Sequence, residues 1–426
     1  MPDTGTATAE DPTVQARAGS PFAALGFRPF RWWFVSQILS ASGGMTQAVA
    51  ASWLVLQLTG SALDLALLSA VSMLPSLLAG AWCGALVDQI ERRRALIGTQ
   101  STLTVLSLVL YMLVETHSAA YWSILVLSAA SGTVNALDGP ARQVYVLDLV
   151  GRRRLAGAVS LYEVILNTSR VLGPALGGLM LTVSGPASCI LVNALSYLAP
   201  LAVLLALRPN RDADQEPRAE AATPASGPLP VPASRRGATR AGLRYAWSVP
   251  AIRSCLLIAA ASGILFSSGV LFPLLADRVF HLGGGGYGTL LSVFGLGALP
   301  GALLAARGGE PTSRQVSVLA AATGLATTAT ACAPDAVLLY VGMALVGLCS
   351  IWMVARTNTF VQLRAAPEMR GRVMGAWVMA LPGASPITGL AFGGLADAAG
   401  ARIAFAAAGL LMLAIVAGSR RVLAAA

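Results

Sequence analysis

The sequence contains no lysine, so arginine supplies all 29 of its basic side chains. Charged residues make up only 11% of the chain, about half the share expected of a soluble domain. This scarcity, together with 56% hydrophobic residues, argues against a soluble protein. The net charge of +10 does not indicate a nucleic-acid partner, because the arginines lie mostly in short loops beside apolar runs and not along one polar face.

Residue types that carry metal or enzyme chemistry are also scarce. The five cysteines include no pair with CxxC spacing and there are only two histidines, so neither a disulfide framework nor a metal site is indicated. The four glycines at 283–286 lack the lysine that completes a phosphate-binding loop. We therefore expect no enzymatic activity, no cofactor and no metal, with energy drawn from an ion gradient.

Long apolar runs are abundant instead, and each reaches the roughly 20 residues that cross a bilayer core as a helix. Only helices or closed barrels satisfy the backbone in lipid, and these runs lack the polar alternation of barrel strands. We predict an all-α polytopic membrane protein with 12 transmembrane helices. The predicted spans are 31–58, 63–87, 95–115, 120–142, 155–182, 187–207, 252–276, 286–306, 315–333, 336–356, 372–396 and 401–419.

The arginines predict how these helices are oriented. Loops on one side hold most of them, including the runs at 92–94 and 152–154, whereas the opposite loops hold only Arg278 and Arg402. Because positive charge is retained on the cytoplasmic side, both termini are expected in the cytoplasm, with the chain a multi-pass protein of the cell membrane.

The polar stretch after the sixth span divides the chain into two halves. We predict two pseudo-symmetric six-helix bundles, since "RLAGA" opens the fifth span and "RVMGA" the eleventh, with paired glycines following in both. The predicted units are a cytoplasmic N-terminal tail (1–29), the first bundle (30–208), a cytoplasmic linker (209–250), the second bundle (251–421) and a C-terminal tail (422–426).

Several motifs resemble a known family. Gly84, Leu86 and Asp88, followed by arginines at 92–94, resemble the signature loop of the major facilitator superfamily, although Gln89 and Glu91 depart from its usual residues. "GPALGG" (173–178) is similar to the antiporter motif of the superfamily's exporters. The stretches "ASWLVLQLTGSA", "NALDGPARQ", "SRVLGPALGG", "LVNALSYLA" and "EMRGRVMGA" resemble the bacterial efflux branch that includes macrolide-efflux and enterobactin-exporter proteins.

The resemblance implies the major facilitator fold and a secondary active exporter that works by alternating access, with proton antiport. Its expected partners are a small-molecule substrate (a drug-like metabolite, antibiotic or siderophore), protons and the lipid bilayer, and we expect a monomer. A nutrient importer or uniporter, or a non-transporting membrane sensor or scaffold, are the alternatives.

Charges near the predicted cytoplasmic ends are candidates for a gate and charge relay. Asp88 in its basic loop favours a gating role, whereas Arg92, Arg93 and Arg94 suit gating and simple anchoring equally. Asp138 and Arg142 are one helical turn apart, so they are expected to pair on one face. That pair is either part of a relay or a static pair that closes a helix end.

The fifth span carries candidates for proton coupling. Glu163, Asn167, Arg170 and Pro174 share a helix face, and intramembrane charges normally face a cavity or a partner. Glu163 and Arg170, with Asp138, are the proton-coupling candidates, while a solvated and inert Glu163 is the alternative. Close helix packing is expected at the antiporter-motif residues Gly173, Pro174, Gly177 and Gly178.

Polar residues within apolar runs predict a substrate cavity. Gln37, Ser40 and Gln47 recur on one face of the first span, which suits hydrogen bonding to a substrate. The further cavity candidates are Asn135, Asn167 and Arg356, of which Arg356 is also expected to find a pairing partner.

Overall fold

The computed structural model describes residues 26–87, 90–150, 155–206, 244–266, 268–307, 309–366, 369–381 and 383–424. Within these ranges the elements are helices and no strand occurs. In chain order they are α2 (Arg28–Thr59), α3 (Ala62–Val87), α4 (Arg92–Glu115), α5 (Tyr121–Val150), α6 (Leu155–Val183), α7 (Gly185–Ser196), α8 (Leu198–Ala206), α10 (Pro250–Phe266), α11 (Ser268–Leu274), the π-helix η4 (Leu275–Val279), α12 (Gly283–Arg307), α13 (Ser313–Ala331), α14 (Ala336–Arg364), α15 (Arg370–Ala380), α16 (Ser385–Ala399) and α17 (Ala401–Ala424).

These helices confirm the predicted fold class. Each predicted span lies on helix, and six helices of the described chain are individually long and apolar enough to cross a membrane. Two predicted spans are interrupted within the described residues: the sixth by a turn at Tyr197, and the eleventh between α15 and α16. The last break precedes Pro386, which stands in the first turn of α16 and, lacking an amide proton, could not continue a helix from α15.

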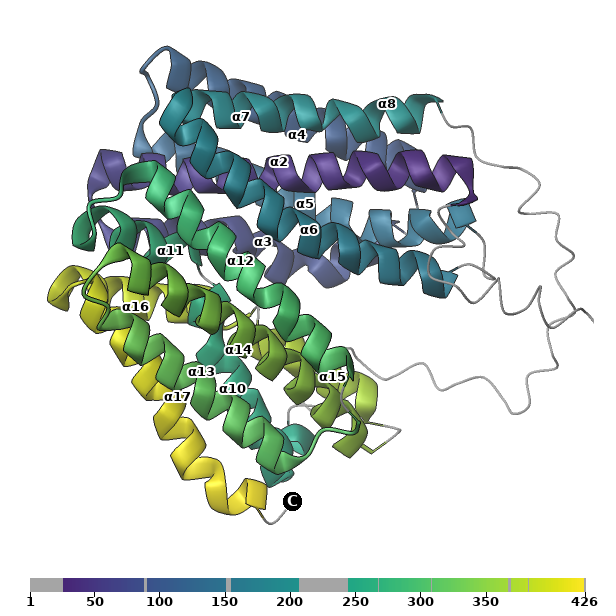
Figure 1. The fold of residues 1–426 in the computed structure, drawn as a ribbon. Helices are drawn as coiled ribbons and strands as arrows, with labels where there is room; N and C mark the ends of the chain where they lie inside the picture. Colours follow the sequence, from purple (N-terminus) through teal and green to yellow (C-terminus); the bar gives the residue numbers. More distant parts are fainter. Residues whose placement is uncertain are drawn as a thin grey trace, which may run out of the picture.

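The helices form two groups. In Figure 1, α2–α8 lie in one group and α10–α17 in the other, and the groups meet at one end and diverge toward the opposite end. Across the meeting place α6 packs on α12 and α3 packs on α16. The start of α2 and the end of α8 lie at the diverging end (Figure 1). The domain boundaries themselves stay a prediction, and residues 207–243 lie outside the described ranges.

The hydrophobic cores follow the same division. One core is shared: it contains side chains of the first group such as Val55 together with side chains of the second such as Phe405. Toward the diverging end the cores are separate, one built around Trp33 in the first group and the other around Phe360 in the second. Burial of apolar surface therefore holds the groups together at one end only. We call that end the closed end.

Glycines let the backbones touch at the closed end. A Cβ atom on Gly178 of α6 would lie 2.6 Å from the Cα atom of Gly288 in α12, closer than real Cβ contacts come. On the other side of the closed end, a Cβ atom on Gly393 of α16 would lie 2.9 Å from the carbonyl oxygen of Ala62 in α3. Any larger side chain at these positions would push the two groups apart.

Candidate functional site

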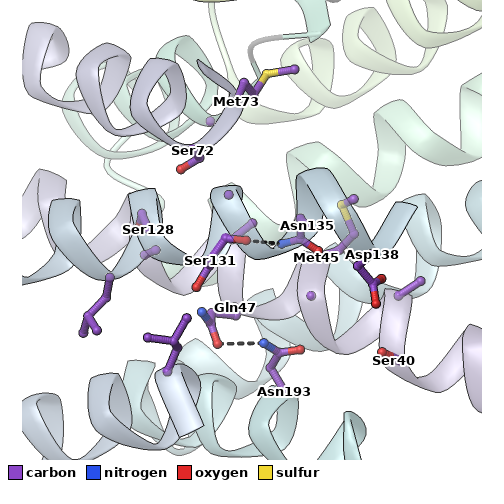
Figure 2. Close-up of a pocket in the computed structure, with 18 of the residues that line it drawn as sticks. Ser40, Met45, Gln47, Ser72, Met73, Ser128, Ser131, Asn135, Asp138 and Asn193 are labelled. Carbon is purple, nitrogen blue, oxygen red and sulfur yellow. Dashed lines mark hydrogen bonds between the residues drawn. The ribbon is translucent and has the colours of Figure 1, made fainter. Parts of the chain in front are cut away.

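A cavity of about 520 Å³ opens among the helices of the first group. Its walls come from α2, α3, α4, α5, α6 and α7, and Gly269 of α11 is contributed by the second group. In Figure 2, Ser72 and Met73 of α3 lie across the space from labelled side chains of α2, α5 and α7. A volume of this size suits a drug-sized molecule.

The lining of this cavity mixes uncharged polar and apolar side chains. The polar set includes Ser40, Gln47, Ser72, Ser128, Ser131, Asn135 and Asn193, and the apolar set includes Met45, Leu68, Met73, Leu106 and Leu127. Methionine side chains are flexible and adapt to differently shaped ligands. Such a lining suits an amphiphilic molecule with several hydrogen-bonding groups.

The predicted cavity residues of α2 occupy different positions in this site. Ser40 and Gln47 line the cavity, whereas Gln37 is buried beside it and accepts a hydrogen bond from Arg142. The Ser40 hydroxyl is buried and has no hydrogen-bond partner among the described residues, and a buried hydroxyl without a partner is costly.

Two amides of the cavity are held by hydrogen bonds. The Asn193 amide nitrogen donates to the Gln47 side-chain oxygen over 2.7 Å and to the Ser107 hydroxyl over 3.3 Å. Asn135 donates to the carbonyl oxygen of Ser131 over 2.9 Å, as Figure 2 shows. These bonds orient the amide groups, so that they present fixed donors and acceptors to the cavity.

The charged part of the site is a buried pair on α5. Asp138, which is 2% exposed, forms an ion pair with Arg142, as their spacing predicted. One carboxylate oxygen of Asp138 also accepts hydrogen bonds from the Thr99 hydroxyl at 2.6 Å and the Gln100 amide at 2.7 Å. Since Arg142 also donates to Gln37, the cluster joins α2, α4 and α5. The proposed relay between this pair and Asp88 stays a prediction, because Asp88 lies outside the described residues.

The fifth predicted span is the helix α6. Glu163 and Asn167 are on it, but their side chains lie outside the described part of the structure; Tyr162, next to Glu163, lines the cavity. Arg170 is exposed on the same helix. The proton-coupling roles of Glu163 and Arg170 stay predictions.

The antiporter motif packs α6 against two neighbours. Gly173 lies against α2, where a Cβ atom would come within 2.7 Å of the Ser42 carbonyl oxygen, and its own carbonyl accepts a hydrogen bond from the Thr46 hydroxyl at 2.9 Å. Gly177 also faces α2, whereas Gly178 and the carbonyl oxygen of Pro174 face α12. One short segment therefore determines packing both within the first group and between the groups.

Arg356 is not among the residues that line the cavity. It is buried in α14, where its guanidinium donates to the Gln315 side-chain oxygen over 2.8 and 3.1 Å. A third bond of 3.4 Å reaches the carbonyl oxygen of Ala305. Its pairing partner is thus an amide and a carbonyl, and the guanidinium ties α12, α13 and α14 together.

The arginines at the start of α4 make contacts within the first group. Arg93 donates to the carbonyl oxygens of Leu204 and Leu205 in the last turn of α8, over 2.8 and 3.3 Å. Arg94 forms an exposed ion pair with Glu91 at 2.6 Å, which contributes little to stability. Arg92 is partly buried. The contacts of Arg93 favour an anchoring role.

Replacing Arg93 by alanine is accordingly expected to lower stability without altering how far the two groups separate. Two charge-assisted hydrogen bonds to the free carbonyls of α8 would be lost, at a cost of about 1–3 kcal/mol. Thermal unfolding in detergent measures the loss, and Arg94→Ala is the matched control with little expected effect. A gating role would instead appear as a changed spacing between the groups.

Sequence reasoning missed Thr99 and Gln100, which bind Asp138, and the polar cavity residues Ser72, Ser128, Ser131 and Asn193. Each is a polar residue within an apolar predicted span, which was the signal used for the first span. Among the described residues no cluster of three or more histidine, cysteine, aspartate or glutamate side chains is placed to hold a metal ion.

The bundle of membrane-length helices and the polar cavity within it define a class: the chain has the architecture of a membrane transporter of the major facilitator superfamily. Similarity to solved structures supports this fold. The nucleoside transporter NupG aligns with a TM-score of 0.68 at 13% identity, covering 93% of this chain and 99% of that one. A bacterial homologue of the human lysosomal transporter Spinster, in an inward-facing and unoccupied conformation, aligns with a TM-score of 0.64 at 15% identity, covering 92% and 94%.

The particular family follows from the sequence comparison. Residues 19–424 match the family described as transmembrane secretion effector, and the chain belongs to that family. It is 31% identical over 390 residues to the multidrug efflux pump Tap of Mycolicibacterium fortuitum, covering 89% of this chain and 92% of that protein. The enterobactin exporter EntS of Escherichia coli is 26% identical over 315 residues, covering 73% and 70%. The predicted resemblance to the enterobactin-exporter branch is thus confirmed.

Proposed function

We propose that this chain is a secondary active exporter of small amphiphilic molecules and that it works by alternating access. One observation carries the proposal: the two groups share a hydrophobic core at the closed end and have separate cores at the other, and a polar cavity in the first group reaches Gly269 of the second. A carrier needs such an arrangement, because a central site must open to one side at a time. The export direction rests on the relatives, which are named as efflux pumps and a siderophore exporter.

The positive-inside bias assigns the diverging end to the cytoplasm, since the arginine-rich start of α4 lies on that side of the membrane. In this orientation the structure is the state that collects cargo from the cytoplasm. The closed end would then face outward and must open to release the cargo.

The cavity lining indicates the kind of cargo. Ser40, Gln47, Asn135 and Asn193 offer uncharged hydrogen-bonding groups, and methionine and leucine side chains offer apolar contact. Antibiotics and siderophores that carry many oxygen atoms on an apolar frame fit this description. The relatives are named for the export of multiple drugs and of enterobactin.

Proton antiport is the proposed source of energy, and Asp138 is the first candidate for the proton site. Its carboxylate lines the cavity and is held by Arg142, Thr99 and Gln100. A cargo molecule that donates hydrogen bonds to the Asp138 carboxylate would compete with a proton for the same oxygen atoms, while Arg142 keeps its hydrogen bond to Gln37. Binding of cargo or of the proton would therefore disfavour binding of the other. Glu163 is the second candidate.

The proposal is tested with inside-out vesicles from a host that lacks its own drug pumps. After acidification of the vesicle interior, a panel of antibiotics, dyes and siderophores is added, and an internal pH-sensitive dye reports proton release. We expect wild-type protein to release protons with at least one compound and Asp138→Asn to release none. Asp335→Asn is the matched control, because Asp335 caps α14 and is not a cavity-lining residue.

The other outcomes are equally informative. Loss of release in Glu163→Gln, with release intact in Asp138→Asn, would assign the proton to Glu163 and leave antiport standing. Absence of release for every compound, with normal amounts of folded protein, would contradict antiport. Direct accumulation of labelled compounds in whole cells would then indicate an importer or uniporter.

A further inference from the structure

At the closed end, a carboxylate of one group caps a helix of the other. Asp397, near the end of α16, accepts a hydrogen bond from the backbone amide of Ala62 over 2.8 Å and from that of Leu63 over 2.9 Å. These are the first amides of α3, which lack partners within their own helix. Asp397 also accepts a hydrogen bond of 3.1 Å from the Ser61 hydroxyl.

The cap is completed from both groups. The Ser61 hydroxyl accepts a hydrogen bond from the amide of Asp64 over 3.2 Å, so the start of α3 has both a local cap and a distant one. Arg278 of η4, in the same group as Asp397, lies 3.7 Å from its carboxylate and holds it in place. A negative charge at the positive end of a helix is electrostatically favourable.

Asp397 lies just beyond the predicted eleventh span, at 32% side-chain exposure. Burial alone would raise its pKa, but the hydrogen bonds from Ala62, Leu63 and Ser61 and the charge of Arg278 together lower the pKa of this carboxyl below its ordinary value. The carboxylate is therefore charged at neutral pH, where it caps α3 most effectively. Asp397 was assigned no role from the sequence.

We propose that Asp397 is a latch that holds the closed end shut and that must be released before this end can open. The contacts that it makes in the other group exist only while α16 lies against α3. When the groups separate, the first amides of α3 lose their cap and the carboxylate keeps only Arg278. The latch therefore stabilises the closed state by as much as one helix cap, which lowers the ratio of open to closed molecules about fivefold.

The test measures the separation of the groups directly and does not depend on which cargo is carried. Spin labels are placed at Val183 of α6 and Leu325 of α13, which are 75% and 60% exposed, after replacement of the native cysteines by alanine. Pulsed electron paramagnetic resonance then gives the distribution of distances in detergent or nanodiscs. We expect Asp397→Ala to increase the population at long distance about fivefold. The isosteric variant Asp397→Asn should give a smaller increase.

Asp335→Ala is the matched control. Asp335 caps α14 within its own group by accepting a hydrogen bond of 2.8 Å from Leu338, so its loss removes a cap without touching the contact between groups. Unchanged distances in both Asp397 variants would overturn the latch, as would an equal change in Asp335→Ala. If Asp397→Ala proves poorly folded, Asp397→Asn, which keeps the shape of the side chain, carries the test. Failure of the export assay would leave this outcome unaffected.

Discussion

Replacing Asp138 by asparagine is expected to abolish proton-coupled export while leaving the protein nearly as stable as the wild type. Asparagine keeps an oxygen that accepts from Thr99 and Gln100, so the packing of α4 against α5 survives. What is lost is the titratable carboxyl and its charge. The cost in stability should be below about 2 kcal/mol, since Arg142 is partly exposed to the cavity and retains Gln37.

Replacing Arg142, the other member of the ion pair, is expected to lower stability much more than replacing Asp138. Arg142→Ala leaves the carboxylate of Asp138 buried without its counter-charge, and breaking a buried pair in this way costs about 3–5 kcal/mol. The double variant Asp138→Asn with Arg142→Ala should regain most of that loss, because no unpaired charge remains. Thermal unfolding of the three variants, beside the vesicle assay, separates the two roles of the pair.

These outcomes distinguish a relay from a static pair. If the pair only closes a helix end, Asp138→Asn should retain proton release and the double variant should also transport. If the pair couples the proton to cargo, both should be inactive although both are folded. A wild-type rate of release in Asp138→Asn would contradict the proposed role of Asp138.

The general fold could be predicted from the sequence because its main determinants are local. A run such as residues 95–115 is apolar enough to cross a membrane by itself, and α4 covers it from Arg92 to Glu115. The i, i+4 spacing of Asp138 and Arg142 likewise belongs to one helix, and their pairing was predicted correctly.

Contacts between distant residues could not be predicted in this way. Gln47 meets Asn193 and Gln37 meets Arg142 only because α2 packs against α7 and α5, and no local periodicity encodes which faces meet. The same holds for Arg356, whose partner Gln315 is on another helix. Polarity within an apolar span does indicate that a residue needs a partner, but the identity of that partner depends on the packing of the whole bundle.

Asp397 shows that contacts of side chains with distant backbone groups could not be predicted either. It lies in a short loop between two predicted spans, and nothing in the surrounding sequence indicates a role for it. Its role depends on the exposed amides at the start of α3, and backbone donors leave no mark on the sequence. Such caps are visible only once the helices have been placed.

Gly288→Ala is expected to prevent full closure of the closed end. Gly288 of α12 touches Gly178 of α6, and we call this contact between the two groups the seam. The new methyl group would overlap the backbone of α6 at Gly178, and backbone cannot move aside as a flexible side chain can. Overpacking of this kind costs about 1–3 kcal/mol, which corresponds to about a 5- to 150-fold shift toward the open state. The distance between spin labels at Val183 and Leu325 should increase, and export should fall because cargo and protons leak through the seam.

Variants at two further glycines distinguish an effect on closure from an effect on stability. A methyl group at Gly394 of α16 meets nothing within 4 Å, so Gly394→Ala should behave as wild type. A methyl group at Gly173 meets Met45 and Ser42 of the same group, so Gly173→Ala should lower the unfolding temperature without favouring separation. If Gly288→Ala lowers stability and leaves the label distance unchanged, the seam is ordinary packing. If the distance grows while the unfolding temperature stays close to that of Gly394→Ala, the glycine contact is part of the gate, because only the equilibrium between the two states has changed.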